Sequence, residues 1–358
     1  MSLVRVETKR PAKQVGKYES TNEYYNIRIV NPYDPTQALQ GPIPIAFNTT
    51  RTSPVLKNPS EYELAVVRFY LPSAVPLFVF DPDGIEPFMN IVMEYNGTQI
   101  TKQIIYDPYC SVCLPARSVL FYQEFLDMVN TTLTGAYADL LAAEPGLPPT
   151  AAPYMTYDAT TQLFSFFAEQ AYDSTLANPV RIYFNAVMYN KFFPSIPFKG
   201  LLNIGNFTYV GIYVSDTKDN TSATDPTIPV GYYRMRGEYS TLALWNDLQT
   251  ILLETDAIPT EPEFEPTEND TTRRVLTDFE PAVEVNDRTA FQFFPQGPLR
   301  WYDLKSQYPL RTLNLRALWQ SKTGQVYPLY LLKGESATLK IRFRRKDTGE
   351  TYDETFEM

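Results

Sequence analysis

Between residues 23 and 346 the chain breaks repeatedly into short runs of alternating apolar and polar residues, rich in β-branched and aromatic side chains. Such runs favour strands, because successive side chains of an extended chain point to opposite faces. Proline, glycine or polar turn residues bound most of the runs, which recur roughly every ten residues. This pattern is typical of an antiparallel β-sandwich of the jelly-roll type rather than of a parallel α/β sheet. We therefore expect a mainly β fold made of one or two such units.

The strongest local signal is the dipeptide Asn96-Gly97, which separates two alternating runs within residues 90–106. A type I′ turn of two residues requires positive φ at both positions, and Asn-Gly adopts it readily. We expect a hairpin here. The pattern predicts a second hairpin across residues 154–168, with a polar turn at 158–161.

One stretch departs from the β pattern. Apolar residues recur every four positions from Phe121 to Leu133, which is the spacing of one face of a helix. The dipeptide Pro145-Gly146 follows and is a stop signal. We expect a single helical insertion near residues 118–143.

The chain is long enough for two packed units, because a single hydrophobic core rarely grows beyond about 250–300 residues. Residues 1–22 lack periodicity and carry more basic than acidic side chains, so we expect a flexible basic arm. We assign residues 23–225 to a β-sandwich with the helical insertion. Residues 226–358 are expected to form a second β region, which is either a second jelly roll or the completion of the first.

The sequence contains no histidine, which excludes Ser-His-Asp and Cys-His catalytic groups and every histidine-ligated metal site. Cys110 and Cys113 form a CxxC motif, but the sequence has no other cysteine to complete a structural zinc site. The motifs GxxxxGK[ST] and GxGxxG are also absent. We therefore predict no cofactor, no metal and no catalytic residue, and we interpret the two cysteines as structural.

Carboxylate chemistry is the enzymatic class that these absences leave open. Two acids at a suitable separation are the requirement for a glycosidase, and a loop rich in oxygen ligands can bind calcium. Solvated loop acids are the simpler interpretation. The candidate acid pairs are Asp81 with Asp83, Asp278 with Glu280, and Glu261 with Glu263, and the candidate calcium loop holds Asp216, Asp219, Asn220 and Asp225.

The formal net charge of −10 argues against general wrapping of nucleic acid, which needs a basic footprint. Basic residues nevertheless gather in two places. If residues 339–346 form a strand, alternation puts a row of bases on one face and Ile341, Phe343 and Arg345 on the other. Because positive charge on an acidic protein suits a complementary surface, we take both clusters as candidate assembly contacts. They are Arg5, Lys9, Arg10, Lys13 and Lys17 in the arm, and Lys340, Arg342, Arg344 and Lys346 in the strand.

Residues 47–72, 248–266 and 276–346 resemble capsid-associated proteins of small icosahedral DNA viruses of eukaryotes, of the polinton-like and virophage kind. The resemblance implies a jelly-roll fold and a structural role as a penton or minor capsid subunit. It also implies identical subunits and other capsid proteins as partners, and a location in the virion after assembly inside the host cell. It implies no catalytic residues.

The composition fits such a role. The 26 tyrosines suit buried subunit contacts, and the 30 prolines stiffen loops that become ordered on assembly. The first twenty residues lack the apolar run of a secretory signal, and no stretch has the length of a membrane span, so we expect neither secretion nor a span. A minor nucleic-acid contact through the basic termini is a further expectation. The alternatives are a carbohydrate- or receptor-binding module, such as a fibre or spike head, and a carboxylate-dependent glycosidase.

Overall fold

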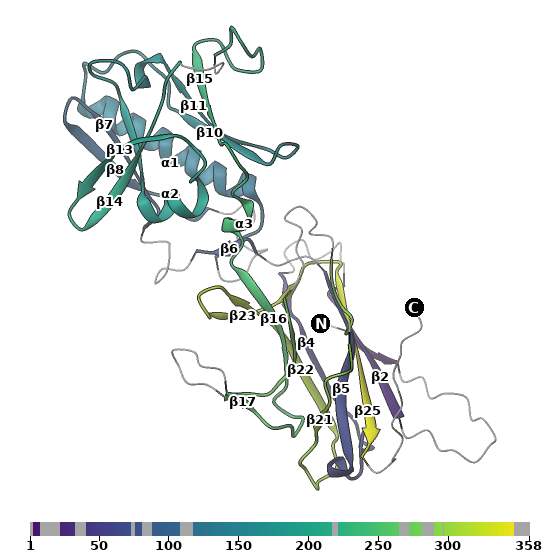
Figure 1. Ribbon diagram of the computed structural model, residues 1–358. Helices are drawn as coiled ribbons and strands as arrows, with labels where there is room; N and C mark the ends of the chain where they lie inside the picture. The colour runs from purple at the N-terminus through teal and green to yellow at the C-terminus, as the bar shows by residue number, and fades with distance from the viewer. Residues whose placement is uncertain are drawn as a thin grey trace. The chain divides into compact units, whose positions relative to one another are not determined.

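A computed structural model describes residues 3–7, 22–32, 41–72, 76–80, 88–107, 117–216, 221–264, 272–280, 290–295 and 297–346. The chain divides into two compact units (Figure 1). Unit 1 comprises Met1–Val75 and Leu248–Met358, and unit 2 comprises Pro76–Asp247. The expected boundary between residues 225 and 226 falls inside unit 2, because the chain leaves unit 1 once and later returns to it.

Unit 1 is built on two antiparallel sheets, which we call sheet one and sheet two. Sheet one has the order β1-β2-β25-β5-β20, with β21 also paired to β5. Its strands are β1 (Leu3–Glu7), β2 (Asn22–Val30), β25 (Ser336–Arg345), β5 (Tyr62–Pro72), β20 (Ala290–Phe293) and β21 (Tyr302–Asp303). Sheet two has the order β19-β16-β22-β23, with β4 also paired to β22. Its strands are β19 (Val275–Phe279), β16 (Leu248–Glu254), β22 (Thr312–Ser321), β23 (Val326–Pro328) and β4 (Ala46–Thr50).

Eight of these strands pair in a nested order. Taken along the chain they are β2, β4, β5, β16, β19, β20, β22 and β25. The first pairs with the last, the second with the seventh, the third with the sixth and the fourth with the fifth. Nested antiparallel pairing across two sheets is the arrangement of a jelly roll. The jelly-roll expectation is confirmed, and unit 2 is inserted between its third and fourth strands.

The inward faces of the two sheets supply the core of unit 1. Along β25, and along β22 as far as Ala317, buried and partly exposed residues alternate, as expected for strands with one buried face. Phe47 of β4 and Phe69 of β5 meet edge to face with ring centroids 6.4 Å apart, which joins the two sheets. Three short elements complete the unit: η1 (Pro59–Glu61), the pair β3 (Ile43–Pro44) with β24 (Tyr330–Leu331), and the pair β17 (Glu263–Phe264) with β18 (Thr272–Arg273).

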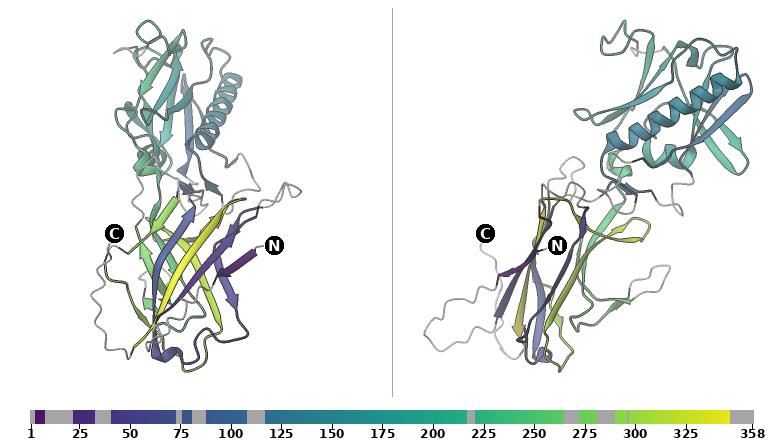
Figure 2. Two further views of the ribbon diagram at one scale, coloured as in Figure 1. Left: turned by 90° about the vertical axis from the view of Figure 1, so that its right-hand side faces the viewer. Right: turned by 180° about the vertical axis from the view of Figure 1, so that it is seen from behind.

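The N-terminal segment differs from the expectation of a flexible arm over residues 1–22. Leu3–Glu7 forms β1, which pairs with β2 over its whole length, from Leu3 opposite Val30 to Glu7 opposite Asn26. β1 lies on the outside of β2 at the edge of sheet one (Figure 2). It satisfies the backbone groups of an otherwise open sheet edge. The five alternating residues of β1 are too few to stand out in the sequence, and residues 8–21 lie outside the described residues.

Unit 2 contains three sheets and three α-helices within its described residues. The five-stranded sheet has the order β13 (Phe198–Ile204), β14 (Phe207–Ile212), β12 (Arg181–Asn185), β7 (Asn90–Tyr95) and β8 (Thr98–Gln103). The other two sheets are β10 (Tyr154–Asp158), β11 (Leu163–Glu169) and β15 (Tyr232–Arg236), and the pair β6 (Phe78–Val79) with β9 (Ser118–Val119). The helices are α1 (Tyr122–Ala143), α2 (Ala186–Phe192) and α3 (Leu242–Trp245), with the 3-10 turn η3 (Gln170–Tyr172).

The local predictions for unit 2 are confirmed. β7 and β8 form the expected hairpin, and Asn96 and Gly97 both have positive φ, of 52° and 86°. β10 and β11 form the second hairpin. α1 is the expected helix and packs against β7, β8 and β10 (Figure 2). It begins four residues later than expected, because Ser118–Val119 pairs with β6 as a strand instead.

Aromatic side chains fill the core of unit 2. Trp245 is 0% exposed, and its ring contacts Phe78 and Phe125 edge to face and stacks on Phe164 with centroids 4.7 Å apart. Its indole N–H donates to the carbonyl oxygen of Phe192 at 3.0 Å. The one polar atom of this large ring is therefore satisfied inside the core.

Candidate assembly surface

β25 carries the predicted basic row. Ile341 and Phe343 are 0% exposed and point into the jelly roll. Lys340, Arg342 and Arg344 occupy the intervening positions and are partly exposed on the outer face of sheet one. Lys346 follows the end of the strand, where its ammonium lies 3.2 Å from the carboxylate of Asp303. The expected alternation of β25 is thus confirmed.

The register of sheet one adds two bases that the sequence analysis missed. Lys340 stands opposite Arg68 of β5, and Thr338 stands opposite Arg28 of β2. Both arginines are exposed. We call Arg28, Arg68, Lys340, Arg342 and Arg344 the basic face. In the sequence, Arg28 lies between two isoleucines of an alternating run, so its outward direction was readable, but the pairing of the strands was not. Arg68 follows the run Leu64–Val66, which is buried without alternation, so the sequence pattern carries no such signal for it.

Aromatic rings lie among these bases. The ammonium of Lys340 is 4.8 Å from the ring centroid of Tyr24, which is 37% exposed. The guanidinium of Arg344 lies 4.0 Å from the ring centroid of Trp301 and that of Arg342 lies 5.4 Å from it. Such cation–π contacts hold the long basic side chains over aromatic rings.

The charges of the basic face are only partly neutralised. Arg344 donates to the carboxylate of Glu63 at 2.7 Å, and Arg342 donates to the neutral amide oxygen of Asn22 at 3.2 Å. Arg28 donates to the hydroxyl of Ser336 at 3.3 Å. Within the described part of the chain, Arg28, Arg68 and Lys340 have no carboxylate partner. The face therefore keeps a net positive charge on an acidic protein.

The basic residues of the N-terminal segment are only partly described. Arg5 stands opposite Arg28 in the register of β1 and β2. The backbone of sheet one thereby places Arg5 of the first basic cluster at a register position beside the basic face, although the two lie far apart in the sequence. Lys9, Arg10, Lys13 and Lys17 lie outside the described residues.

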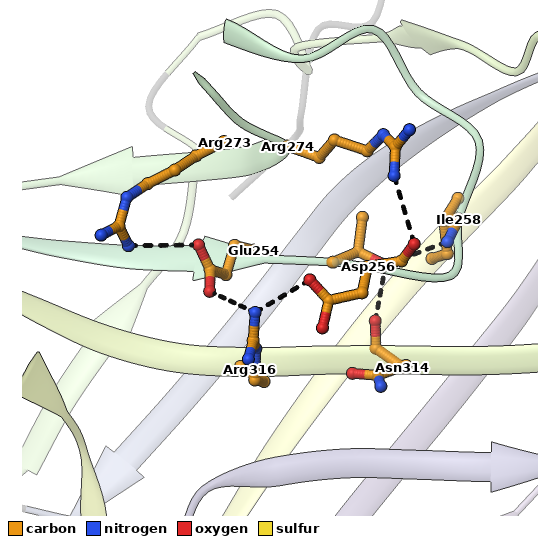
Figure 3. Close-up of polar contacts among 8 residues, drawn as sticks. Glu254, Asp256, Ile258, Arg273, Arg274, Asn314 and Arg316 are labelled. Atoms are coloured by element: carbon orange, nitrogen blue, oxygen red, sulfur yellow. Dashed lines mark hydrogen bonds and ion pairs between the residues drawn. The ribbon is translucent and has the colours of Figure 1, made fainter. Parts of the chain in front are cut away.

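A second polar site lies on sheet two, where a groove of about 550 Å³ opens beside Glu254, Arg273 and Arg316. Glu254 lies between the two arginines (Figure 3). Arg316 donates to Glu254 at 2.8 Å, and Arg273 donates to its other oxygen at 3.4 Å. Arg316 also donates to Asp256 at 2.8 Å. Because Glu254 is 6% exposed, its charge is balanced inside the protein, which makes this network a structural link between β16, β18 and β22.

Among the described acids of the candidate pairs, Glu261, Glu263 and Asp278 are held by bases. Arg300 contacts both Glu263 and Asp278, and Lys305 lies 3.1 Å from Glu261. Hydrogen bonds from Thr227 and then Arg234 lower the pKa of Asp225 to about 2, which keeps this carboxylate charged. Asp81, Asp83, Asp219, Asn220, Cys110 and Cys113 lie outside the described residues.

The residues that the structure describes contain no cluster of three or more acidic or cysteine side chains placed to hold a metal ion. Among the described helices, none combines the length and the apolar character needed to span a bilayer.

The chain is similar to proteins of the Sputnik virophage. It is 30% identical over 206 residues to the Sputnik structural protein V19, which corresponds to 53% of this chain and 93% of that protein. It is 31% identical over 152 residues to the Sputnik uncharacterized protein V18, or 35% of this chain and 87% of that protein.

Solved structures extend the similarity to most of the chain. A chain of the cryo-electron microscopy structure of the Sputnik virophage matches with a TM-score of 0.69 and 29% identity, covering 93% of this chain and 100% of that chain. The mavirus penton protein shares the fold, with a TM-score of 0.60 and 17% identity, covering 90% of this chain and 99% of that one. The family described as Sputnik minor capsid protein V18/19 matches residues 23–345, and the chain therefore belongs to this family of structural capsid proteins.

Proposed function

We propose that the protein is a penton or minor capsid subunit that works by associating with identical copies and with other coat proteins, and that the basic face is one of its contact surfaces. The observation that carries the proposal is the gathering of five bases from three strands on one exposed face of a chain with net charge −10. The similarity to the mavirus penton protein over 99% of its length supports the penton position.

Two properties suit the basic face to a subunit contact, namely its positive charge and its ordered aromatic rings. Arg28, Arg68 and Lys340 contribute positive charge without a carboxylate partner among the described residues, so an acidic neighbour gains attraction without breaking an ion pair of that part of the chain. Tyr24 and Trp301 hold bases in place and offer the large rigid rings that enrich protein interfaces. A positive face on an acidic chain also orients the approach of further copies, because opposite charges attract over about 8–10 Å in physiological salt.

The proposal extends to the N-terminal bases and to nucleic acid. We include Arg5, Lys9, Arg10, Lys13 and Lys17 in the contact surface, because the register brings Arg5 beside Arg28. A minor contact with the packaged genome through these termini fits the same positive charge. Assembly inside the host cell, without secretion, is part of the proposal.

We also propose that the protein has no catalytic role. Both carboxylate oxygens of Glu254 accept from arginines, as the groove on sheet two shows, and Glu263 and Asp278 share Arg300. A glycosidase needs one protonated carboxyl group and one carboxylate free to reach its substrate. Carboxylates engaged by guanidinium groups suit neither task.

Particle incorporation tests the proposal. The chain is co-expressed with the other coat proteins of its particle, and its copy number per purified particle is compared for wild type and the double variant Lys340→Glu/Arg68→Glu. Neither position has a carboxylate partner within the described ranges of the chain, so the reversal should leave the fold intact. The matched control, Arg51→Glu/Lys57→Glu, changes the net charge equally in the loop between β4 and η1. We expect loss of incorporation for the first variant only.

Further measurements separate the alternatives. Replacing Lys9, Arg10, Lys13 and Lys17 by glutamine should lower incorporation into particles while leaving β1 intact. Mass measurement should find a closed oligomer of identical copies. Normal incorporation of both the basic-face variant and the N-terminal variant would contradict the assembly role of these residues. Specific capture of a glycan by a smaller oligomer would favour the receptor-binding alternative instead.

A further inference from the structure

The sequence directly after β25 is opposite in charge to the basic face. Residues 347–358 read DTGETYDETFEM and contain no lysine or arginine. Five of these residues are acidic, namely Asp347, Glu350, Asp353, Glu354 and Glu357. Tyr352 and Phe356 lie among the acids, as Tyr24 and Trp301 lie among the bases. The segment thus has the complementary charge and the same mixture of charge with aromatic rings.

We propose that the basic face binds residues 347–358 of a neighbouring copy of the chain. The inference rests on the proposed function, since it names the partner of the same surface. An acidic segment carrying aromatic side chains satisfies both features of the face: its carboxylates pair with Arg28, Arg68 and Lys340, and its rings pack against Tyr24 and Trp301.

The dimensions allow this contact. Twelve extended residues span at most about 40 Å, whereas Lys340 and Arg344 are separated by only about 13 Å along β25. The segment is therefore long enough to cover the basic row. The residue before the segment is held in sheet one: the backbone N–H of Lys346 donates to the carbonyl oxygen of Glu61 at 2.9 Å, and its ammonium lies 3.2 Å from Asp303.

A neighbouring copy as the acceptor fits the proposed function, in which identical copies associate. A segment and a face that differ, but complement each other, form a head-to-tail contact between identical copies. Such contacts close into a ring when the rotation between copies is suitable, which fits a subunit that surrounds a vertex.

A peptide with the sequence of residues 347–358 provides the first test. Its binding to protein that lacks residues 347–358 is measured by fluorescence anisotropy at low ionic strength. We expect binding that weakens with salt and falls by about tenfold in Lys340→Glu/Arg68→Glu, since two attractive pairs become repulsive. The control Arg51→Glu/Lys57→Glu should bind as wild type does. A peptide with amides in place of its five carboxylates should not bind. Equal binding by both variants, or no binding by the truncated protein, overturns the proposal.

Charge exchange in the full chain tests whether the acceptor is a neighbour. Sedimentation is measured for Lys340→Glu/Arg68→Glu and for Asp353→Lys/Glu354→Lys, alone and mixed. Each variant alone should lose self-association, and the mixture should recover it, because both contacts between unlike copies are then complementary. Recovery only when all four changes are in one chain, with no effect of mixing, would show docking within a copy and would overturn the proposal. Self-association that responds to neither pair of changes also overturns it.

Two results separate this inference from the proposed function. If Lys340→Glu/Arg68→Glu abolishes incorporation into particles but deletion of residues 347–358 does not, the assembly role stands and this inference fails. If the truncated protein binds a DNA duplex through the basic face but not the peptide, the occupant is nucleic acid and the inference fails again.

Discussion

The guanidinium of Arg344 lies over the ring of Trp301, 4.0 Å from its centroid, and donates to Glu63 at 2.7 Å. β25, β5 and the residue before β21 are joined by this one side chain. A planar guanidinium can stack and donate at the same time, whereas an ammonium has neither the plane nor the fixed fork of donors.

Arg344→Lys is therefore expected to destabilise unit 1 despite keeping the charge. Loss of the stacking contact should cost about 0.5–1 kcal/mol. Urea unfolding measures the change, with Lys340→Arg as the control, because an arginine there keeps the contact with Tyr24. An unchanged unfolding midpoint for Arg344→Lys would show that the stacking contributes nothing.

The turn of the β7–β8 hairpin should not tolerate a β-branched residue. Gly97 has a φ of 86°, so Gly97→Val should lower stability by roughly 1 kcal/mol or more. Gly146 is the matched control, since a Cβ there meets nothing within 4 Å and its φ is outside the left-handed region. Gly146→Val should unfold close to wild type. If the two variants melt together, the type I′ turn is not the reason for the glycine.

The network on sheet two predicts unequal effects for its two acids. Glu254→Gln leaves two arginines without their shared buried charge, and should cost roughly 1–3 kcal/mol. The side chain of Asp256 is 59% exposed, so Asp256→Asn should change stability by less than about 1 kcal/mol. Denaturant titration of both variants checks the contrast, and equal losses would contradict it.

Each unit has its own core, which predicts separable unfolding. Trp245 of unit 2 is 0% exposed and Trp319 of unit 1 is 2% exposed. Replacing either ring by alanine should cost about 3–5 kcal/mol in its own unit. Calorimetry should then show one transition lowered by Trp245→Ala and a different one lowered by Trp319→Ala. A single transition that both variants lower equally would mean that the units unfold together.

Alkaline pH should destabilise unit 2. Burial, followed by the charge of Glu124, raises the pKa of Tyr106 to about 12, and burial raises the pKa of Tyr189 to about 12. In the unfolded chain both groups titrate near their ordinary value of about 10. The folded state thus retains these protons after the unfolded state has lost them. Their contribution to stability is complete below about pH 10 and is lost as the pH rises towards 12. Urea unfolding on both sides of this window measures the loss, which should be smaller in Tyr106→Phe.

Local patterns in the sequence predicted much of the fold. The Asn96-Gly97 turn, the helix from Phe121 onward and the alternation of β25 all follow from preferences that act over a few residues. Because these preferences act only over a few residues, they do not predict features that depend on distant parts of the chain. β1 has only five residues, and its pairing with β2 depends on an edge that the sequence does not reveal. The start of α1 shifted because Ser118–Val119 found a strand partner in β6.

The sequence likewise predicted only part of the basic face. Alternation alone placed Lys340, Arg342 and Arg344 on one face of a strand. Arg28 and Arg68 joined them only because β2 and β5 flank β25 in sheet one. The groove around Glu254 and Arg316 likewise needed β16 and β22 to become neighbours.

The sequence by itself determined that the chain is β-rich, where its main hairpins turn, and which side of each strand is apolar, because these depend on φ preferences and on the two-residue period of an extended chain. Only the tertiary structure decided which strands pair, that unit 2 is inserted between β5 and β16, and that bases from three distant strands share one face. Strand pairing is chosen by how the two sheets bury their apolar sides together, against the entropy of closing long loops. Strand pairing therefore depends on the whole chain and cannot be predicted from any single segment.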